Sequence, residues 1–342
     1  MRRNKYLRHG FLSILALAMS LSATAARADV VRSDITDIGQ SLKLPVYKWS
    51  DESASAKGVI FAIHGATLYA RRFQTAAEHF AQQGYPVYAL DLRGFGSWRT
   101  NGTEYADGDE LIHYQMSEND IVQVLTKLRE ANPDAKIYCL GESLGANLAV
   151  WVGSEHPALA DGLVLVSPCV KNCVHIGPRL VVDLVLGFLN PNRNMSLSPY
   201  IKPYLCDDRL ATAEYIDDPE IRHVLSPVEL VKSFKTNTLA IAEMDKMPAD
   251  LPVLVVAGKR DKIYSSRAIP RFVNGMGSKR KTVEIIPNHG HLLIESPRVR
   301  PGVLSIIDGW LSESDRTARA PLSKSAAETT ADADISKLGS TR

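Results

Sequence analysis

The sequence predicts an α/β fold with a mostly parallel central sheet that helices flank on both faces. Apolar runs of strand length alternate with segments of helical periodicity through most of the 342 residues. Runs such as 59–63 and 163–166 are apolar at every position, which is typical of parallel strands buried on both faces. In addition, Gly-Glu-Ser-Leu-Gly at 141–145 separates one apolar run from a helical pattern. Together these observations favour a layered α/β architecture.

The expected elements follow the chain in order. Strands are expected at 41–49 (an edge strand, from its alternating polarity), 59–63, 86–90, 136–140, 162–167, 252–257 and 281–286. Helices are expected at 71–83, 117–131, 146–156, 266–275 and 301–311. Gly84 suits the C-terminal end of the first helix, Ser117 is expected to cap the second, and Pro157 stops the third.

Residues 170–250 interrupt this alternation. They contain several prolines and helical stretches, such as 179–189 and 227–244, without a convincing buried strand. The insertion follows the carboxyl end of a strand, which is the edge where open α/β sheets bind ligands. We therefore expect a helical cap over the functional site, with a packing appendage remote from the chemistry as the alternative.

The first 28 residues have the pattern of a secretory signal peptide. A basic stretch at 1–9 leads into the apolar stretch 11–19, and small residues end in Ala-Arg-Ala before Asp29. An exported protein, periplasmic or secreted, is expected; an uncleaved membrane anchor is the alternative. These 28 residues hold five of the 40 basic residues and none of the 38 acidic ones, so the remainder is slightly acidic. No basic stripe is visible, and nucleic acid is not an expected partner.

The chain is expected to divide into five parts. They are a signal peptide (1–28), the first part of the core (29–169), the helical cap (170–250), the second part of the core (251–312) and a C-terminal tail (313–342). The tail is rich in small and polar residues, which predicts disorder.

A serine nucleophile is expected at the turn between a strand and a helix. Glycines two residues on either side of Ser143 allow a tight turn that exposes the hydroxyl. A serine hydroxyl needs a base, and the base needs an acid that orients it. Asp261 and His291 each follow a predicted strand, so both should emerge at the edge of the sheet where Ser143 lies. His289 is the nearest rival for the base.

Four segments resemble the monoacylglycerol lipase and serine aminopeptidase S33-like group of α/β-hydrolases, often called lysophospholipase-like. They are His64-Gly65, Asp-Leu-Arg-Gly-Phe-Gly at 91–96, the turn at 141–145, and Asp261 with Gly290-His291 and Glu-Ser-Pro at 295–297. The resemblance covers roughly residues 40–312.

The resemblance implies an α/β-hydrolase fold with the cap inserted before the strand that carries the catalytic acid. Ser143 would be the nucleophile, His291 the general base and Asp261 the acid that orients it. The backbone N–H groups of Ala66 and Leu144 would form the oxyanion hole. The chemistry needs only the triad and water, so no cofactor or metal is implied.

Several neighbouring residues invite further expectations. Glu142 stands where the group often has histidine, and it could raise the pKa of His291 or face solvent. His64 is expected to support, through hydrogen bonds, the turn that contains Ala66, which we call the oxyanion turn. Asp91 and Arg93 are expected to form a packing and ion-pair network beside Ser143. Tyr69 is expected either to touch substrate or to form part of a wall.

Four cysteines follow the signal peptide. Cys139 is expected to be a buried thiol within a strand. Because export permits disulfides, one bridge is expected among Cys169, Cys173 and Cys206, with the pair unassigned. A metal site at Cys169, Cys173 and His175 is the alternative, although the spacing fits no standard zinc pattern.

The expected function is hydrolysis of carboxylic esters through an acyl-enzyme on Ser143. A monoacylglycerol, a lysophospholipid or another acyl ester would be the substrate, and apolar cap helices could make transient contact with a membrane surface. A serine aminopeptidase or amidase is the alternative within the fold. It would need a cap carboxylate to bind the substrate amine, and the candidates are Asp217, Asp218, Glu220 and Glu243. A non-catalytic binding module is the alternative from another class.

Overall fold

The computed structural model describes residues 30–99, 111–173, 193–201 and 209–316, with scattered positions between 182 and 191. The predicted signal peptide and most of the predicted tail lie outside these residues. Within the described part, no helix is long and apolar enough to cross a membrane.

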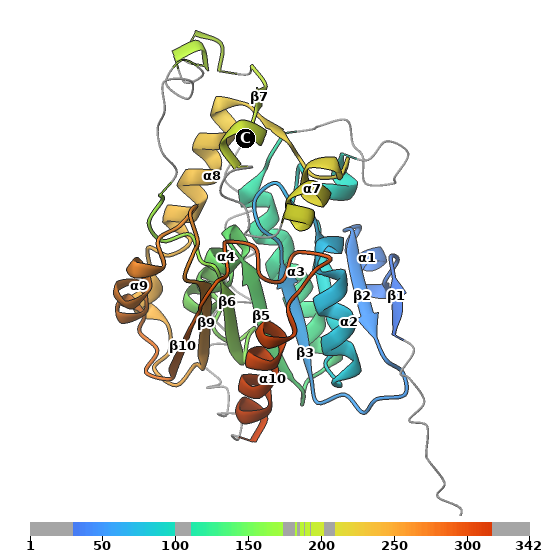
Figure 1. Ribbon diagram of the computed structural model, residues 1–342. Coiled ribbons are helices and arrows are strands. Elements are labelled where there is room, and N and C mark those ends of the chain that lie inside the picture. The colour runs from blue at the N-terminus through green and yellow to red at the C-terminus, as the bar shows by residue number, and fades with distance from the viewer. Residues whose placement is uncertain are drawn as a thin grey trace, which may run out of the picture.

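An eight-stranded sheet forms the centre of the fold (Figure 1). Its strand order is β1-β2-β4-β3-β5-β6-β9-β10. The strands are β1 (Val31–Ser33), β2 (Val46–Ser50), β3 (Gly58–Ile63), β4 (Val87–Leu90), β5 (Lys136–Glu142), β6 (Gly162–Val166), β9 (Val253–Gly258) and β10 (Lys281–Ile286). All neighbouring pairs from β4 to β10 are parallel, whereas β1 and β2 are antiparallel additions at one edge.

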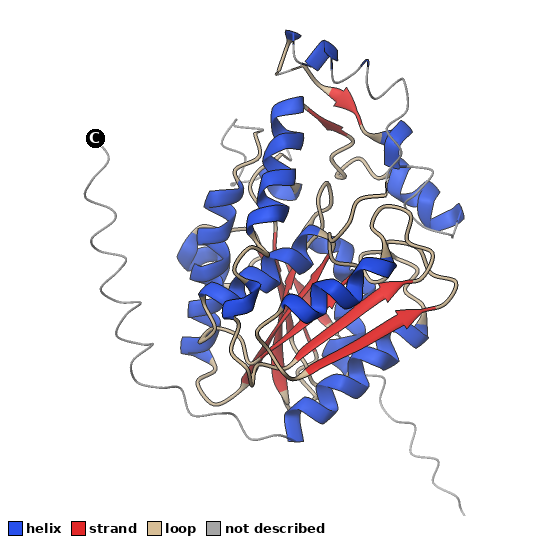
Figure 2. Ribbon diagram, turned by 90° about the vertical axis from the view of Figure 1, so that its left-hand side faces the viewer, coloured by secondary structure: helices blue, strands red, loops and turns tan. Residues whose placement is uncertain are grey.

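Helices cover both faces of the sheet (Figure 2). One apolar core joins the sheet to α3 (Tyr114–Ala131), α4 (Leu144–Glu155) and α9 (Ile269–Gly275). The core on the other face joins it to α2 (Gln74–Gln82) and α10 (Pro301–Arg316). The predicted α/β-hydrolase architecture is therefore confirmed, and its strands read as apolar runs because both of their faces are buried.

The segment between β6 and β9 rises above the carboxyl edge of the sheet (Figure 1). We call residues 170–250 the cap. Its described elements are β7 (Met195–Ser196), α6 (Ser198–Ile201), α7 (Arg209–Asp217), β8 (Val224–Leu225), α8 (Pro227–Leu239) and the short helix η3 (Met244–Lys246). Ser226 and Glu229 form a capping box at the start of α8, with Pro227 at its first position.

The N-terminal edge differs from the prediction of one strand at 41–49. Residues 37–42 form the helix α1 (Asp37–Leu42), and β2 begins only at Val46. The Thr36 side chain accepts a hydrogen bond from the N–H of Gly39 and so caps α1. Strand β1 was not predicted, because a three-residue edge strand carries little periodicity.

Two helix boundaries also differ from the prediction. Helix α3 begins at Tyr114, and Ser117 is not its cap: the Ser117 hydroxyl accepts a hydrogen bond from the N–H of Arg93, in the loop after β4. Helix α10 continues to Arg316, so 313–316 are not part of a disordered tail. Asp315 accepts hydrogen bonds from the hydroxyls of Tyr85 and Tyr138, and these contacts extend the helix.

The close packing of α4 against the sheet depends on two glycines. A Cβ at Gly145 would lie 1.8 Å from the carbonyl oxygen of Ile63 in β3, and a Cβ at Gly141 would lie 2.2 Å from the backbone of Gly145. Neither backbone can move without shifting a buried strand or the helix. These glycines therefore set the position of the turn at Ser143.

We predict that Gly145→Ala lowers the free energy of unfolding by about 3 kcal/mol or more, because the added methyl group meets backbone that cannot yield. Urea unfolding measures it. Gly309→Ala in α10 is the matched control: nothing lies within 4 Å of the added methyl group, so it should stabilise the protein by about 0.5–1 kcal/mol. A Gly145→Ala protein as stable as the wild type would contradict this account of the packing.

Candidate active site

Ser143 occupies the sharp turn between β5 and α4. Its φ is +58°, a conformation that non-glycine residues rarely adopt. Its N–H donates to the carbonyl of Val166 in β6 at 2.9 Å, which ties the strained turn to the neighbouring strand. The turn leaves the hydroxyl at the carboxyl edge of the sheet.

The structure brings Ser143, His291 and Asp261 together in one hydrogen-bonded line. Nε2 of His291 lies 2.9 Å from Oγ of Ser143, and Nδ1 lies 2.8 Å from Oδ2 of Asp261. A carboxylate only accepts, so Nδ1 carries a proton and donates it, which leaves Nε2 free to accept from the serine hydroxyl. This is the arrangement in which an imidazole can take a proton from serine.

Each partner is held from behind. Oδ1 of Asp261 accepts hydrogen bonds from the N–H groups of Ile263 and Tyr264 at 2.8 and 2.9 Å. The hydroxyl of Ser167 donates to the carbonyl of His291 at 2.6 Å. By contrast, the rival base His289 is half-buried, and its Nδ1 lies 2.8 Å from the carbonyl oxygen of Pro287. His291 is therefore the imidazole that faces Ser143.

The pKa of His291 is raised. Burial of the ring favours its neutral form, but the nearby charge of Asp261 and the hydrogen bond to it outweigh that effect, and Glu142 adds to it. A higher pKa makes the imidazole a stronger base toward the serine proton.

Glu142 is fully buried beside this line, so the alternative in which it faces solvent is wrong. Its carboxylate accepts the N–H groups of Leu293, Ile294 and Glu295 at 2.5, 3.2 and 2.7 Å. These three residues lie two to four positions after His291. The residue before the nucleophile therefore holds the loop that carries the base, a role that the sequence pattern did not reveal.

Glu295 extends the same network to the turn after β3. Both of its carboxylate oxygens accept the N–H of Gly65, at 2.9 and 3.0 Å. Burial raises the pKa of Glu295 well above its usual range, and the neighbouring charge of Glu142 raises it further. The pKa of Glu142 is also raised by burial, but three backbone N–H groups oppose that effect.

Both residues expected to form an oxyanion hole belong to segments next to Ser143: Leu144 follows it, and a Cβ at Gly65, the residue before Ala66, would lie 3.3 Å from the Ser143 Cβ. Leu144 is the first residue of α4, where backbone N–H groups have no partner within the helix. Ala66 follows Gly65 and lines the same cavity as Ser143 and His291. His64 accepts the N–H of Leu92 through Nε2 and bonds the carbonyl of Gly65 through Nδ1. Burial lowers its pKa to about 4, so His64 is a neutral support of this turn.

A cavity of about 800 Å³ opens at Ser143. Its walls are mostly apolar, and many come from the cap, which is therefore no remote appendage. Apolar lining residues include Val170, Leu197, Leu225, Leu230, Ile241 and Ile263. The polar lining residues include Asn172, Ser233, Asn237 and Thr238. An apolar pocket with a few polar groups is typical of sites for small organic ligands.

Cys169 also lines the cavity. Its Sγ lies 3.4 Å from Oγ of Ser143, and burial raises the pKa of the thiol to about 12. Cys139, Cys169 and Cys173 are free thiols. Neither Cys169 nor Cys173 therefore takes part in the predicted disulfide, and Cys206 and His175 lie outside the described residues.

The expected network of Asp91 and Arg93 is present, but the two residues have separate partners. Asp91 does not pair with Arg93: it accepts hydrogen bonds from the N–H groups of Ala70 and Ser97 and from a tyrosine hydroxyl. Arg93 instead pairs with Asp120 in α3. Tyr69 donates to a cap residue, Asp218, at 2.8 Å.

We predict that Glu142→Gln lowers the pKa of His291 by roughly half a unit to one unit, because a charge that favours the imidazolium is removed. An NMR titration of the His291 ring measures it. Glu313→Gln, at an exposed position in α10, is the control and should leave this pKa unchanged. A pKa that stays constant or rises in the Glu142 variant would refute the charge contribution.

Comparisons with known proteins agree with this geometry. Residues 54–298 match the family profile of the serine aminopeptidase S33 family. Monoglyceride lipase from Mus musculus is 26% identical over 269 residues, which cover 76% of this chain and 84% of the relative. Monoacylglycerol lipase from Mycolicibacterium smegmatis is 24% identical over 267 residues, covering 77% of this chain and 90% of the relative.

Solved structures share the fold. Monoacylglycerol lipase from Paleococcus ferrophilus superposes with a TM-score of 0.62 at 20% identity, covering 84% of this chain and 99% of its own. A monoglyceride lipase from Saccharomyces cerevisiae gives 0.65 at 17% identity, covering 85% and 96%. The resemblance drawn from the sequence is thus confirmed: the chain belongs to the serine aminopeptidase S33 family, within its monoglyceride lipase-like group, and is a serine hydrolase of the α/β-hydrolase fold.

Proposed function

We propose that this protein is an exported esterase that cleaves esters of an apolar acyl chain, such as a monoacylglycerol, through an acyl-enzyme on Ser143. The hydrogen-bonded line from Ser143 through His291 to Asp261, opening into a mostly apolar cavity, is the observation that carries this proposal. The similarity to monoglyceride lipases supports the same substrate class.

The reaction would run in two halves. The Ser143 oxygen attacks the ester carbonyl carbon while Nε2 of His291 takes the serine proton. The N–H groups of Ala66 and Leu144 would bind the oxyanion that forms. The ester bond then breaks, and His291 gives its proton to the departing alcohol. In the second half, water gives a proton to His291 and attacks the acyl carbon. The bond between the acyl carbon and the Ser143 oxygen then breaks, and His291 returns the proton to that oxygen, which releases the acid and restores Ser143.

An aminopeptidase is less well supported. The carboxylates that it would need are engaged elsewhere: Asp218 accepts from Tyr69 and Arg72, and Glu220 pairs with Arg71. Glu243 pairs with Lys246 at the surface, and Asp217 is exposed. Among the described residues, no carboxylate lines the cavity. A binding module without catalysis is disfavoured because all three triad positions are filled and hydrogen-bonded.

The cap also supports transient contact with a lipid surface. Val231 and Phe234 on α8 are 67% and 70% exposed, and Phe234 belongs to the rim of the cavity. Exposed apolar side chains beside a cavity mouth are suited to withdrawing a lipid from an interface.

We predict that Ser143→Ala abolishes turnover of p-nitrophenyl esters and labelling by a fluorophosphonate probe, with little change in Tm. A panel of graded acyl length should favour medium or long chains over acetate, because the cavity walls are apolar. Aminoacyl anilides are the comparison substrates. Faster turnover of the anilides, or esterase activity that survives in the Ser143 variant, would overturn the proposal.

Export predicts that the full chain, made in a bacterial host, is recovered outside the cytoplasm with Asp29 at its N-terminus. Sequencing the N-terminus of the fractionated protein measures this. Arginine in place of Ala26 and Ala28 should abolish cleavage before Asp29, because signal peptidase needs small residues there. A wild-type chain that stays in the cytoplasm with residues 1–28 attached would contradict export.

A further inference from the structure

The turn that should carry one oxyanion donor contains a strained residue. Thr67 follows Ala66 and has a φ of +72°, in the left-handed region. A β-branched residue is a genuine outlier there. Such strain persists only where the surrounding structure enforces it, and it is concentrated at functional sites. The contacts that hold Thr67 therefore support the conformation of the turn that contains Ala66.

Those contacts come from the cap. The carbonyl of Thr67 accepts the backbone N–H of Arg222 at 2.9 Å. Its hydroxyl lies 2.7 Å from the hydroxyl of Tyr215, a buried residue of α7. On the other side of the turn, the core residues Glu295 and His64 hold Gly65, and Ala66 packs against the apolar core.

Arg222 is itself fixed. Its guanidinium is buried, donates to the carbonyl of Gly94 at 2.8 Å and pairs with Glu229 at 2.5 Å. Glu229 belongs to the capping box that starts α8. The backbone N–H of Arg222 is thus held between the core loop after β4 and a cap helix, and it cannot follow Thr67 if the turn relaxes.

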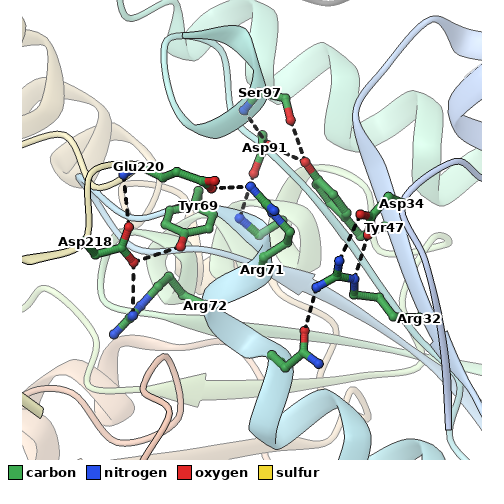
Figure 3. A network of polar contacts seen from close by, with 12 residues as sticks. Arg32, Asp34, Tyr47, Tyr69, Arg71, Arg72, Asp91, Ser97, Asp218 and Glu220 are labelled. Carbon is green, nitrogen blue, oxygen red and sulfur yellow. Dashed lines mark hydrogen bonds and ion pairs between the residues drawn. The ribbon is translucent and has the colours of Figure 1, made fainter. Parts of the chain in front are cut away.

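A second set of contacts joins the cap to the segment just after Thr67 (Figure 3). Asp218 accepts hydrogen bonds from Tyr69 at 2.8 Å and Arg72 at 3.2 Å, and Glu220 pairs with Arg71. The cap loop at 218–222 therefore binds the core on both sides of Leu68. The cap loop that contacts residues 69–72 is therefore the same loop that holds Thr67 in the oxyanion turn.

We propose that Tyr215 and Arg222 are positioning residues: the docked cap holds Thr67 in its left-handed conformation and so aims the Ala66 N–H at the oxyanion. This inference rests on the proposed esterase function and adds to it a dependence of turnover on the cap. Neither residue needs to touch the reacting atoms. When the hydrogen bond from Tyr215 is removed, Thr67 relaxes to negative φ, the Ala66 N–H turns away and transition-state binding weakens, whereas the apolar walls that bind the acyl chain are left in place.

The test is Tyr215→Phe, which removes one hydroxyl. We expect kcat for a p-nitrophenyl ester to fall by about tenfold, less than for complete loss of an oxyanion donor, with KM changed by less than about twofold. The affinity for a trifluoromethyl ketone with the same acyl chain should fall in parallel, because its adduct with Ser143 places an oxyanion in the hole. Thr67→Val breaks the same hydrogen bond from the other end and should show the same loss.

Tyr114→Phe is the matched control. The Tyr114 hydroxyl also joins core to cap, at 2.8 Å from the hydroxyl of Ser233 in α8, but it does not touch the oxyanion turn. Its removal should change kcat by less than about twofold. In a Thr67→Gly background, where positive φ costs nothing, Tyr215→Phe should also lose its effect.

Three outcomes would overturn the proposal: an unchanged kcat in Tyr215→Phe and Thr67→Val, an equal loss in Tyr114→Phe, or a tenfold loss that persists in the Thr67→Gly background. In each of these cases the wild type still hydrolyses the ester and takes the fluorophosphonate label. A wild type that does neither refutes the esterase function itself, so the two failures can be told apart.

Discussion

The close approach of α4 to β3 at Gly145 is the constraint on which the site depends. With no side chain between them, helix and strand meet backbone to backbone, and the turn before the helix has a single available path. That path gives Ser143 its positive φ and leaves the side chain of Glu142 buried. One local packing requirement thus places the nucleophilic hydroxyl beside the imidazole of His291 and the Glu142 carboxylate against the backbone of Leu293. The carboxylate matters to the site because it binds the backbone of the loop that follows His291, the proposed base.

Two buried carboxylates then join segments that are distant in sequence. Glu142 holds the loop that follows His291, and Glu295 in that loop holds Gly65 beside Ala66. Nucleophile, base and oxyanion turn are therefore parts of one hydrogen-bonded unit. Burying charge is costly, and the raised pKa values of both carboxyl groups reflect that cost. Backbone N–H groups offset part of it, since an ionised carboxylate accepts several donors at once.

The sequence predicted what local pattern and topology determine. Ser143, Asp261 and His291 each follow an apolar run, and parallel strands bring their carboxyl ends to one edge, so their meeting could be expected from order alone. The partners of Glu142 could not be predicted from the sequence, because they lie about 150 residues away along the chain. Ser117 matched the preference of a helix cap, but the N–H of Arg93 was a competing donor that local pattern does not reveal. The positive φ of Thr67 could not be predicted from the sequence, because threonine rarely adopts that conformation.

The strain at Thr67 also bears on why a hydrolase of this kind would keep a cap. A cavity needs a roof only to exclude water and to select an acyl chain, and apolar residues alone can do both. Here Tyr215 and Arg222 of the cap also form hydrogen bonds with a core turn whose conformation is unfavourable by itself. A glycine at position 67 would remove the strain and with it the dependence on the cap. Threonine makes the geometry conditional, because the turn is stable only when the docked cap supplies both partners. The residue type at this one position therefore couples closure over the substrate to the electrostatics of the transition state.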